Sequence, residues 1–402
     1  MKRSFFILLS LAVLSLSAQD NIQWRGTDRT GIYRETGLMK SWPANGPEML
    51  WHYGGLGEGH SSVAIASGKI YVTGLSDGKG HLFVFNSKGK LLNKIMYGDE
   101  WTVNYVGTRG TPTIDNGKIY LVSGIGDLIC WDENKLDVLW KRNIFNDFGS
   151  TNIAWGVNES PLIIGEKIIV TPGGKEHNIV ALNKHTGELI WSSPGKGDLS
   201  AYCSPLYIED QRTPLIVTIT ARNIVGLEAS TGKVLWSHES VNKNSIHANT
   251  PIYSDNMVLC SSVDKGSTML RLTDGGRKAE IVWELPELDN MMGALIKTGG
   301  YFYGSGSGYK NKLWYCVDWK TGEIKWKEKV LSAGNIITAD GMLYCYTDKG
   351  EMALVKPTPE KFDIVSQFQI TMGTEQHWAH PVIHKGMMYV RHGNTLMAYA
   401  IK

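Results

Sequence analysis

Short apolar runs follow one another along almost the whole chain, and turn residues separate them. A typical run is GKIYV at residues 68–72, which recurs as GKIYL at 117–121 and as GMMYV at 386–390. Runs of this length, rich in β-branched and aromatic residues and bounded by glycine, proline or asparagine, are typical of strands. A helical period does not appear between them. The pattern therefore predicts an all-β protein.

The strand-like runs belong to a repeat. Copies of the GKIYV run start at residues 68, 117, 166, 213, 256, 300, 341 and 386, and are separated by 41 to 49 residues. A period of about 40 to 50 residues is typical of propellers and solenoids. Most copies follow a short strand that opens with Ser-Pro, Thr-Pro or His-Pro, and precede two further strands. Four strands per copy predict an eight-bladed β-propeller of four-stranded antiparallel blades.

A tryptophan recurs in the last strand of most copies. HTGELIW at 185–191, TGKVLW at 231–236 and TGEIKW at 321–326 place it four residues after a turn glycine. A buried aromatic side chain removes up to about 250 Å² from water, so we expect these residues to fasten neighbouring blades. The predicted blade-docking residues are Trp51, Trp140, Trp191, Trp236, Trp283 and Trp326. The position falls near Asn93 in the first copy and near Ser366 in the seventh.

The two ends of the chain predict how the ring closes. The last copy, residues 380–401, supplies three strands and no tryptophan strand. GPEMLW at 46–51 repeats the missing phrase near the start, with a step of five residues. If the strand of Trp51 completes the last blade, the ring closes by pairing the two ends, which removes the exposed sheet edges that an open stack would leave. We therefore predict a single propeller over residues 47–402.

The first residues predict export. Lys2 and Arg3, the apolar run 5–16 and the small residues Ser17 and Ala18 are typical of a cleaved signal peptide over residues 1–18. The residue directly after the expected cleavage point is not a cysteine, so we expect no lipid anchor. No later apolar run is about 18 residues long, so we expect no membrane span. The mature protein is expected to be soluble, monomeric, and periplasmic or secreted. Residues 19–46 would form a leader that packs on the propeller.

Charge and cysteine content exclude some functions. The chain has 41 Lys and Arg against 39 Asp and Glu, and removing Lys2 and Arg3 makes it neutral. Without a basic cluster, nucleic acid and anionic membranes are poor partners. The cysteines form no CxxC pair or haem-attachment motif, and we expect them to be buried. They are Cys130, Cys203, Cys260, Cys316 and Cys345, of which Cys203 is nearest a loop.

The GKIYV and TGxxxW phrases together resemble the PQQ-like β-propeller repeat family. That family spans pyrroloquinoline-quinone dehydrogenases and the cofactor-free lipoprotein BamB, and the resemblance covers about residues 47–402. The leader, with QWRGTDRTG at 23–31 and TGL at 36–38, is similar to that of exported propellers labelled BamB-like or polyvinyl-alcohol-dehydrogenase-like. Trp24 and Arg25 would either belong to a site or pack across the propeller, and we favour packing. The resemblance implies the fold and leaves the activity open, because propellers host unrelated functions.

Candidate site residues come from the positions that precede the innermost strand of each blade, which converge on one mouth of the channel. One ring of such positions holds His60, Arg109, Asn158, Tyr202, Ala248, Met292, Ala333 and Trp378. Neighbouring positions add Glu159, His247, Asn249, Asn335, His377 and His380, and the loops add Trp101, Tyr105, Phe148 and Trp155. These residues predict either a pocket in which aromatic faces stack on a ligand, or a structural plug.

Three functions follow from this ring. We expect a cofactor-free binding or scaffold protein with a protein partner or a glycan at the channel mouth. The alternative is a carbohydrate-binding or carbohydrate-active propeller, for which no catalytic pair can be assigned among Glu58, Glu100, Glu159 and Glu375. A PQQ-dependent dehydrogenase is a third interpretation. It needs a calcium ion, for which only Asn158 and Glu159 suggest ligands, and no Cys-Cys pair occurs. We therefore expect neither PQQ, calcium nor another metal.

Overall fold

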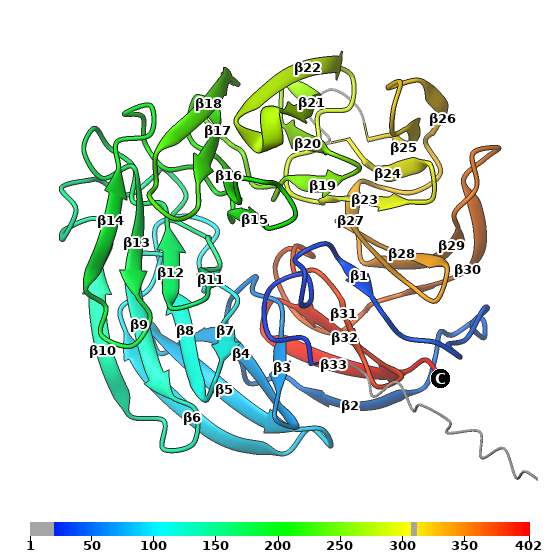
Figure 1. Cartoon of the computed structure of the whole chain (residues 1–402). Coiled ribbons are helices and arrows are strands. Elements are labelled where there is room, and N and C mark those ends of the chain that lie inside the picture. Colours follow the sequence, from blue (N-terminus) through cyan, green and yellow to red (C-terminus); the bar gives the residue numbers. More distant parts are fainter. Residues whose placement is uncertain (1–19, 307–311) are drawn as a thin grey trace, which may run out of the picture.

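The computed structural model describes residues 20–306 and 312–402. Their strands form eight sheets arranged in a ring (Figure 1). The only helical element among them is a 3₁₀ turn, η1 (Asp274–Gly276). The predicted eight-bladed, all-β propeller is therefore confirmed. Within the described residues no helix is long and apolar enough to cross a membrane. The signal peptide predicted over residues 1–18 lies outside them.

In seven blades the four strands are hydrogen-bonded in chain order, and the first strands of several adjacent blades contact one another around the channel. Blade 1 consists of β3 (Ala64–Ala66), β4 (Lys69–Ser76), β5 (Lys79–Asn86) and β6 (Leu91–Gly98), and blade 2 of β7 (Thr113–Asp115), β8 (Lys118–Val122), β9 (Asp127–Asp132) and β10 (Val138–Asn143). Blade 3 consists of β11 (Leu162–Ile164), β12 (Lys167–Val170), β13 (Ile179–Asn183) and β14 (Leu189–Ser193). Blade 4 consists of β15 (Leu206–Ile208), β16 (Leu215–Ile219), β17 (Asn223–Glu228) and β18 (Val234–Glu239).

Blades 5 to 8 complete the ring, and the last one contains both ends of the propeller. Blade 5 consists of β19 (Ile252–Ser254), β20 (Met257–Ser262), β21 (Gly266–Thr273) and β22 (Lys278–Leu285), and blade 6 of β23 (Leu295–Thr298), β24 (Tyr301–Ser305), β25 (Trp314–Asp318) and β26 (Ile324–Glu328). Blade 7 consists of β27 (Gly334–Ala339), β28 (Met342–Thr347), β29 (Glu351–Lys356) and β30 (Asp363–Gln369). Blade 8 consists of β31 (Val382–His384), β32 (Met387–His392), β33 (Thr395–Ala400) and β2 (Met49–Tyr53). Since β2 pairs antiparallel with β33, the predicted closure is confirmed.

Burial explains why the central strands read as continuous apolar runs. The second and third strands of a blade lie between two neighbouring blades, so both of their faces are covered. In blade 2, Ile119 to Val122 of β8 and Asp127 to Trp131 of β9 are all buried, whereas β10 is half exposed. A strand with both faces in the core does not alternate. All five cysteines lie within the described residues, are buried as expected, and form no disulfide.

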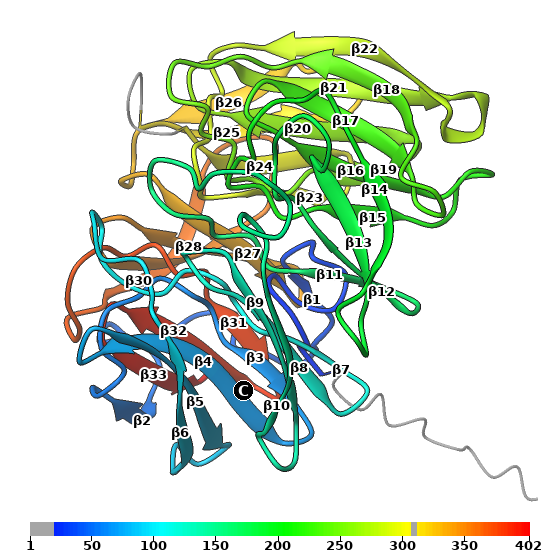
Figure 2. The same cartoon turned by 90° about the vertical axis from the view of Figure 1, so that its left-hand side faces the viewer.

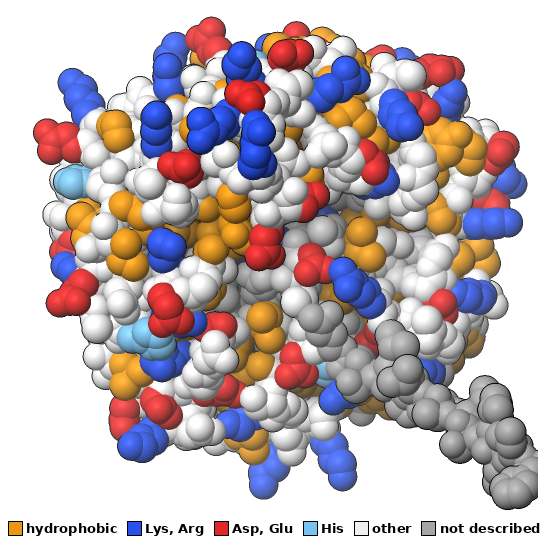
Figure 3. Space-filling view, in the orientation of Figure 1, with side chains coloured by type: hydrophobic (Ala, Val, Ile, Leu, Met, Phe, Trp, Pro, Cys, Tyr) orange, Lys and Arg blue, Asp and Glu red, His pale blue; other side chains and the backbone are white. Residues whose placement is uncertain are grey.

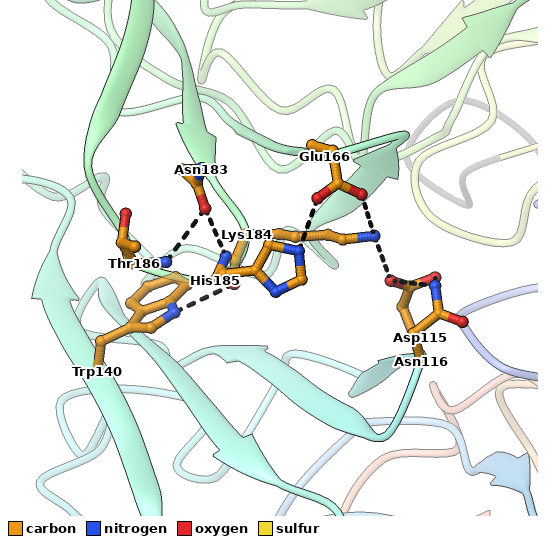
Figure 4. Close-up of polar contacts among 8 residues, drawn as sticks. All are labelled: Asp115, Asn116, Trp140, Glu166, Asn183, Lys184, His185 and Thr186. Atoms are coloured by element: carbon orange, nitrogen blue, oxygen red, sulfur yellow. Dashed lines mark hydrogen bonds and ion pairs between the residues drawn. The ribbon is translucent and has the colours of Figure 1, made fainter.

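Most docking tryptophans contact a turn glycine of the next blade, whereas Trp326 donates to the carbonyl of Thr358 in a turn without glycine. Trp140 of blade 2 lies against Gly187 of blade 3, where an added Cβ would be 2.8 Å from the ring. Its indole N–H donates to the carbonyl of Lys184, 3.1 Å away (Figure 4). The same contact joins Trp51 to Gly89, Trp191 to Gly232 and Trp283 to Gly322. The Thr-Gly turn therefore needs glycine twice, for its φ of 73° at Gly187 and for the approach of the ring.

Polar contacts reinforce this junction between blades 2 and 3. The nearly buried ammonium of Lys184 pairs with Asp115 at 2.9 Å and with Glu166 at 3.2 Å (Figure 4). His185 reaches the other oxygen of Glu166 at 2.7 Å.

On the face shown in Figure 3, basic and acidic side chains are interspersed, with no large field of one sign. That distribution agrees with the balanced composition of the chain.

Two junctions lack the tryptophan. At blade 1 the position is Asn93, and the facing turn of blade 2 carries Leu136 with a φ of 63° in place of glycine. Leu136 packs against the apolar cluster there, so a side chain on the turn occupies space that an indole fills elsewhere. At blade 7 the position is Ser366, whose hydroxyl accepts a hydrogen bond from the backbone of Trp42 at 2.9 Å.

Trp42 of the leader supplies the missing ring between blades 7 and 8. Its ring lies 5.7 Å from Tyr344 and 5.4 Å from Phe368, and the residue is 6 % exposed. The docking tryptophans of other blades contact the corresponding tyrosine in the same way, as Trp140 does with Tyr120 at 6.2 Å. The leader therefore completes a blade junction that the repeat itself leaves without tryptophan.

The leader also fills the channel. Its strand β1 (Ile32–Tyr33) pairs in parallel with β27, and it lies at the centre of the ring in Figure 1 and beside β27 in the side view of Figure 2. The guanidinium of Arg25 donates to the carbonyl of Leu295 at 3.0 Å, and that of Arg29 donates to the carbonyls of Ser160 at 2.9 Å and Pro161. One short segment thus connects blades on opposite sides of the ring.

A belt of hydrogen bonds joins consecutive blades around the same channel. The backbone N–H of Ser62 donates to the hydroxyl of Thr111 at 3.0 Å, that of Thr111 to Ser160 at 3.3 Å, and that of Ser160 to Ser204 at 3.0 Å. Three of these hydroxyls belong to the Ser-Pro and Thr-Pro phrases of the repeat. The phrase therefore supplies an acceptor that each preceding blade needs at its buried edge.

Candidate functional site

A cavity of about 190 Å³ lies at the end of the channel where the innermost strands begin. Aromatic and sulfur-containing side chains form much of its wall, and polar groups are spaced between them. The lining residues are Trp24, His60, Tyr105, Arg109, Thr111, Trp155, Asn158, Ser160, Tyr202, Ser204, Ile246, Ala248, Met291, Met292, Trp378 and His380. Among the described residues that line it, none is acidic.

The structure brings most of the proposed ring together at this cavity. Lining positions from the ring are His60, Arg109, Asn158, Tyr202, Ala248, Met292 and Trp378, and Ala333 is left out. His380, Tyr105 and Trp155 line it as well. Trp378 lies between His60, at 4.9 Å, and Tyr105, at 5.1 Å, whereas Trp155 faces Tyr202 at 6.2 Å. The repeat period therefore locates one ring of side chains in space.

Other candidate residues point away from the cavity into structural contacts. Glu159 is fully buried, and one of its oxygens accepts the backbone N–H of Thr171 at 2.9 Å. Burial raises its pKa to about 8, so this carboxyl group is mostly protonated at neutral pH. His247 contacts the carbonyl of Ala221 at 3.2 Å and the amide of Asn242 at 3.3 Å.

The remaining candidates hold loops beside the cavity. Asn335 donates to the carbonyl of Trp378 at 3.0 Å, which fixes the neighbouring backbone. His377 stacks on His392 with ring centroids 3.6 Å apart. Asn249 links blades 5 and 6 by accepting the backbone N–H of Ala294 at 3.0 Å, while Phe148 packs in the core of blades 2 and 3. Trp101 does not line the cavity and lies under the Arg109 guanidinium at 5.7 Å.

Arg109 orders the loop that borders the cavity. Its guanidinium donates to the carbonyls of Gly107 at 2.6 Å, Tyr105 at 2.8 Å and Asn104 at 3.1 Å. Burial lowers its pKa to about 10, so the group stays charged at neutral pH. Its main task in this structure is to shape the loop, because three of its N–H groups are engaged by that loop.

The two histidines of the cavity wall are neutral. Burial first, and then the charges of Arg109 and Arg391, lower the pKa of His60 to about 3. Burial and then Arg25 lower the pKa of His380 to about 3. The backbone of Tyr105 lies near His60, yet neither ring nitrogen reaches hydrogen-bond geometry with any described residue.

Further acceptors in the wall are also without partners. The Nε2 of His380 lies 3.1 Å from the carbonyl of Met292, and a carbonyl only accepts, so Nε2 carries the hydrogen. The lone pair is then on Nδ1, for which the described part of the chain offers no partner. The side-chain oxygen of Asn158 is likewise buried and unpaired within residues 20–306 and 312–402. Buried polar groups normally have partners, so these atoms indicate a place for a ligand or for water.

Sequence reasoning missed part of the lining. Trp24 was favoured as a packing residue, yet it contributes to the wall and its ring lies 5.4 Å from His380. The leader therefore has two roles: Trp24 lines the cavity, and the neighbouring Arg25 packs against the propeller by donating to a backbone carbonyl of blade 6. Ile246 lies one residue before the candidate His247, and Met291 lies one residue before Met292 of the ring. A wider window of sequence around each ring position would have included both.

The donor set does not fit a calcium-bound quinone. Calcium requires six to eight oxygen ligands, usually including carboxylates. Glu159 is directed to Thr171 and is mostly protonated, and Asn158 offers a single amide oxygen. Within the described residues, no group of three or more His, Cys, Asp or Glu side chains is arranged to hold a metal ion.

The fold and the cavity define a repeat propeller that presents an aromatic pocket at one channel mouth. A family model described as outer membrane protein assembly factor BamB matches residues 98–328, more than half of the 402 residues. The chain therefore belongs to this PQQ-repeat family.

Known proteins are similar to this chain in sequence or in fold. BamB of Shewanella oneidensis is 24% identical over 230 residues, which cover 56% of this chain and 54% of that protein, so the match spans about half of the relative's length. The BamB structure from Moraxella catarrhalis has a TM-score of 0.64 at 14% identity, covering 88% of this chain and 99% of that one. A europium-containing methanol dehydrogenase reaches 0.69 at 14% identity, with 93% and 90% covered. At these identities the structural likeness shows the fold alone.

Proposed function

We propose that this protein is an exported, cofactor-free binding or scaffold protein that acts through its channel-mouth face. Membership of a family described as an assembly factor supports a scaffold or binding role. Export rests on the N-terminal sequence, which is typical of a signal peptide. The absence of a cofactor rests on the donor set of the cavity, which is a poor match for calcium.

One observation carries the proposal beyond the family. The loop between β6 and β7, which borders the cavity, exposes Val103, Tyr105 and Val106 by 75%, 49% and 38%. Arg109 holds the same loop in place through three backbone carbonyls. Adjacent exposed apolar side chains beside a cavity are typical of an interaction site. A loop that is ordered in this way presents them without a large entropic cost on binding.

Site-specific photocrosslinking in native cells tests the proposal. A photoreactive residue at Val103 is expected to form a cross-linked product with a defined partner, whereas one at Ile32 is not. Ile32 is a matched control, because it is also an exposed apolar residue, with 42% of its surface accessible. It lies in strand β1 of the leader, away from the loop between β6 and β7 (Figure 2). The additional change Val106→Asp should abolish the Val103 product. Equal products from both positions, or none from either, would contradict a partner-binding role for this face.

A further inference from the structure

We infer that the cavity binds one neutral sugar ring at the end of a glycan. This inference rests on the proposed binding role and specifies what the channel mouth receives. It follows from the shape, the hydrogen-bonding groups, the charge and the volume of the cavity, which point independently to the same class of ligand.

The aromatic walls suit a ring that has apolar faces. Trp378 lies on one side with Tyr105, and Trp155 lies with Tyr202 in another part of the wall. A pyranose ring presents C–H groups on its two faces and hydroxyl groups around its edge. Indole and phenol rings offer large, rigid apolar surfaces against which such faces can pack, at a small cost in side-chain entropy.

The unpaired polar atoms suit a ligand that brings hydrogens. Nδ1 of His380 and Oδ1 of Asn158 are acceptors, and neither has a partner in the described parts of the chain. The neutral ring of His60 adds one donor and one acceptor; the backbone of Tyr105 lies near this ring, but neither ring nitrogen reaches hydrogen-bond geometry with a described residue. A hydroxyl group both donates and accepts, so neighbouring hydroxyls of a sugar can satisfy all three side chains.

Charge opposes a cation. A cation would find no acidic side chain among the described lining residues, and would face the positive Arg109, with Arg25 and Arg391 nearby. An anion would meet the lone pairs of His380 and Asn158, and Arg109 has three of its five N–H groups engaged by its own loop and the carboxyl group of Glu100 nearby. A neutral ligand brings no further charge into this buried site.

The volume limits the ligand to about one ring. A cavity of about 150 Å³ accommodates a six-membered ring such as benzene. The volume of about 190 Å³ is therefore enough for one six-membered ring with its substituents. The leader fills the channel with β1 and with the side chains of Arg25 and Arg29, so the ring can enter only from the mouth. A terminal glycosyl unit therefore fits better than the interior of a chain.

Calorimetric titration of the full-length mature protein tests the inference. The probes are glucose, galactose, mannose, N-acetylglucosamine, xylose and cellobiose, with glucuronate and glucosamine as charged analogues. Saturable binding of at least one neutral sugar is expected, together with weaker binding of the charged ones. Asn158→Ala and Trp378→Ala should each weaken the affinity by about tenfold or more, the loss expected for one hydrogen bond or stacking contact.

Matched controls separate binding from folding. Asn134→Ala, at the exposed turn between β9 and β10, removes the same atoms as Asn158→Ala and should leave the affinity unchanged. Thermal midpoints of all variants should stay near that of the wild type. Tighter binding of glucuronate or glucosamine than of neutral sugars, or no heat from any of these probes, would overturn the inference. So would an affinity that neither cavity variant alters.

The cross-linking experiment distinguishes this failure from failure of the proposed function. If no sugar binds but Val103 still cross-links to a partner, the scaffold role stands and the sugar assignment is wrong. Loss of that cross-link in Trp378→Ala, without sugar binding, would assign the cavity to a side chain of a partner protein. Sugar binding without any cross-link would support the cavity ligand and remove the protein partner.

Discussion

Trp42→Ala is expected to weaken the junction between blades 7 and 8. Trp42 is 6 % exposed and packs between Tyr344 of blade 7 and Phe368 at the outer edge of the same blade. Gly46 reaches the same ring of Phe368, where an added Cβ would lie 2.5 Å away. Removing the indole therefore leaves a cavity between the leader, β28 and β30, next to the strand that closes the ring.

The magnitude follows from the buried area. A buried tryptophan removes about 150–250 Å² from water, which at about 25 cal/mol per Å² corresponds to roughly 4–6 kcal/mol. Measured Trp→Ala changes in cores cost about 3–5 kcal/mol, and the neighbours of Trp42 can relax because the leader is a single strand of chain. A decrease of about 3 kcal/mol in the free energy of unfolding is expected, which lowers the thermal midpoint by several degrees.

Scanning calorimetry measures the midpoint, and limited proteolysis shows where the chain opens. Cleavage in Trp42→Ala should start near β2 and β30, the strands on either side of the junction. Trp191→Ala provides a comparison, since it removes a docking ring between blades 3 and 4 and should lower the midpoint to a similar extent. Lys40→Ala is the control in the leader. A midpoint unchanged in Trp42→Ala but lowered in Trp191→Ala would refute the assignment of Trp42 as a docking residue.

Two further predictions concern buried positions. Asn93→Trp should lower the thermal midpoint, because the new indole collides with Leu136. Adding Leu136→Gly to this variant should recover most of the loss. If the effects of the two changes on the midpoint simply add, residues 93 and 136 do not share one packing site. Glu159 has a folded pKa of about 8, raised from its unfolded value by burial, so only the folded state keeps the proton between about pH 4.5 and 8. Stability should therefore fall as the pH rises through this window, and Glu159→Gln should remove the fall; an unchanged pH profile in denaturant titrations would contradict the buried carboxyl group.

The period of the sequence predicted the fold well because each blade solves the same packing problem. A covered central strand must be apolar on both faces, and most turns beneath an indole carry glycine, so both features recur in the sequence. The junctions where this rule is broken were not predictable in the same way. Trp42 lies outside the repeat, and only the three-dimensional closure brings it to Ser366. Leu136 replaces glycine where Asn93 replaces tryptophan, and the two positions are distant in sequence.

The same reasoning explains why the ring of site positions was partly predictable. Positions before the innermost strands converge because every blade starts at the channel, so the period places His60, Asn158 and Trp378 together. The period does not determine the direction of a side chain one residue away. Glu159 follows Asn158 yet points into blade 3 towards Thr171. Alternation along an extended backbone sends neighbouring side chains to opposite sides.

The proposed role of the channel mouth is supported by what the rest of each blade is required to do. The strands, turn glycines and Ser or Thr acceptors of the repeat are engaged between blades, and substitution there weakens the ring. The ring positions of the mouth hold residues as different as His60, Tyr202 and Trp378, because no blade junction fixes them. The unpaired atoms of His60 and Asn158 lie at these positions, whereas that of His380 lies in the His-Pro phrase of the last blade, whose backbone carbonyl accepts a hydrogen bond from Ser62. A binding site can therefore change here without loss of the fold, which is the property expected of a propeller adapted to its own ligand.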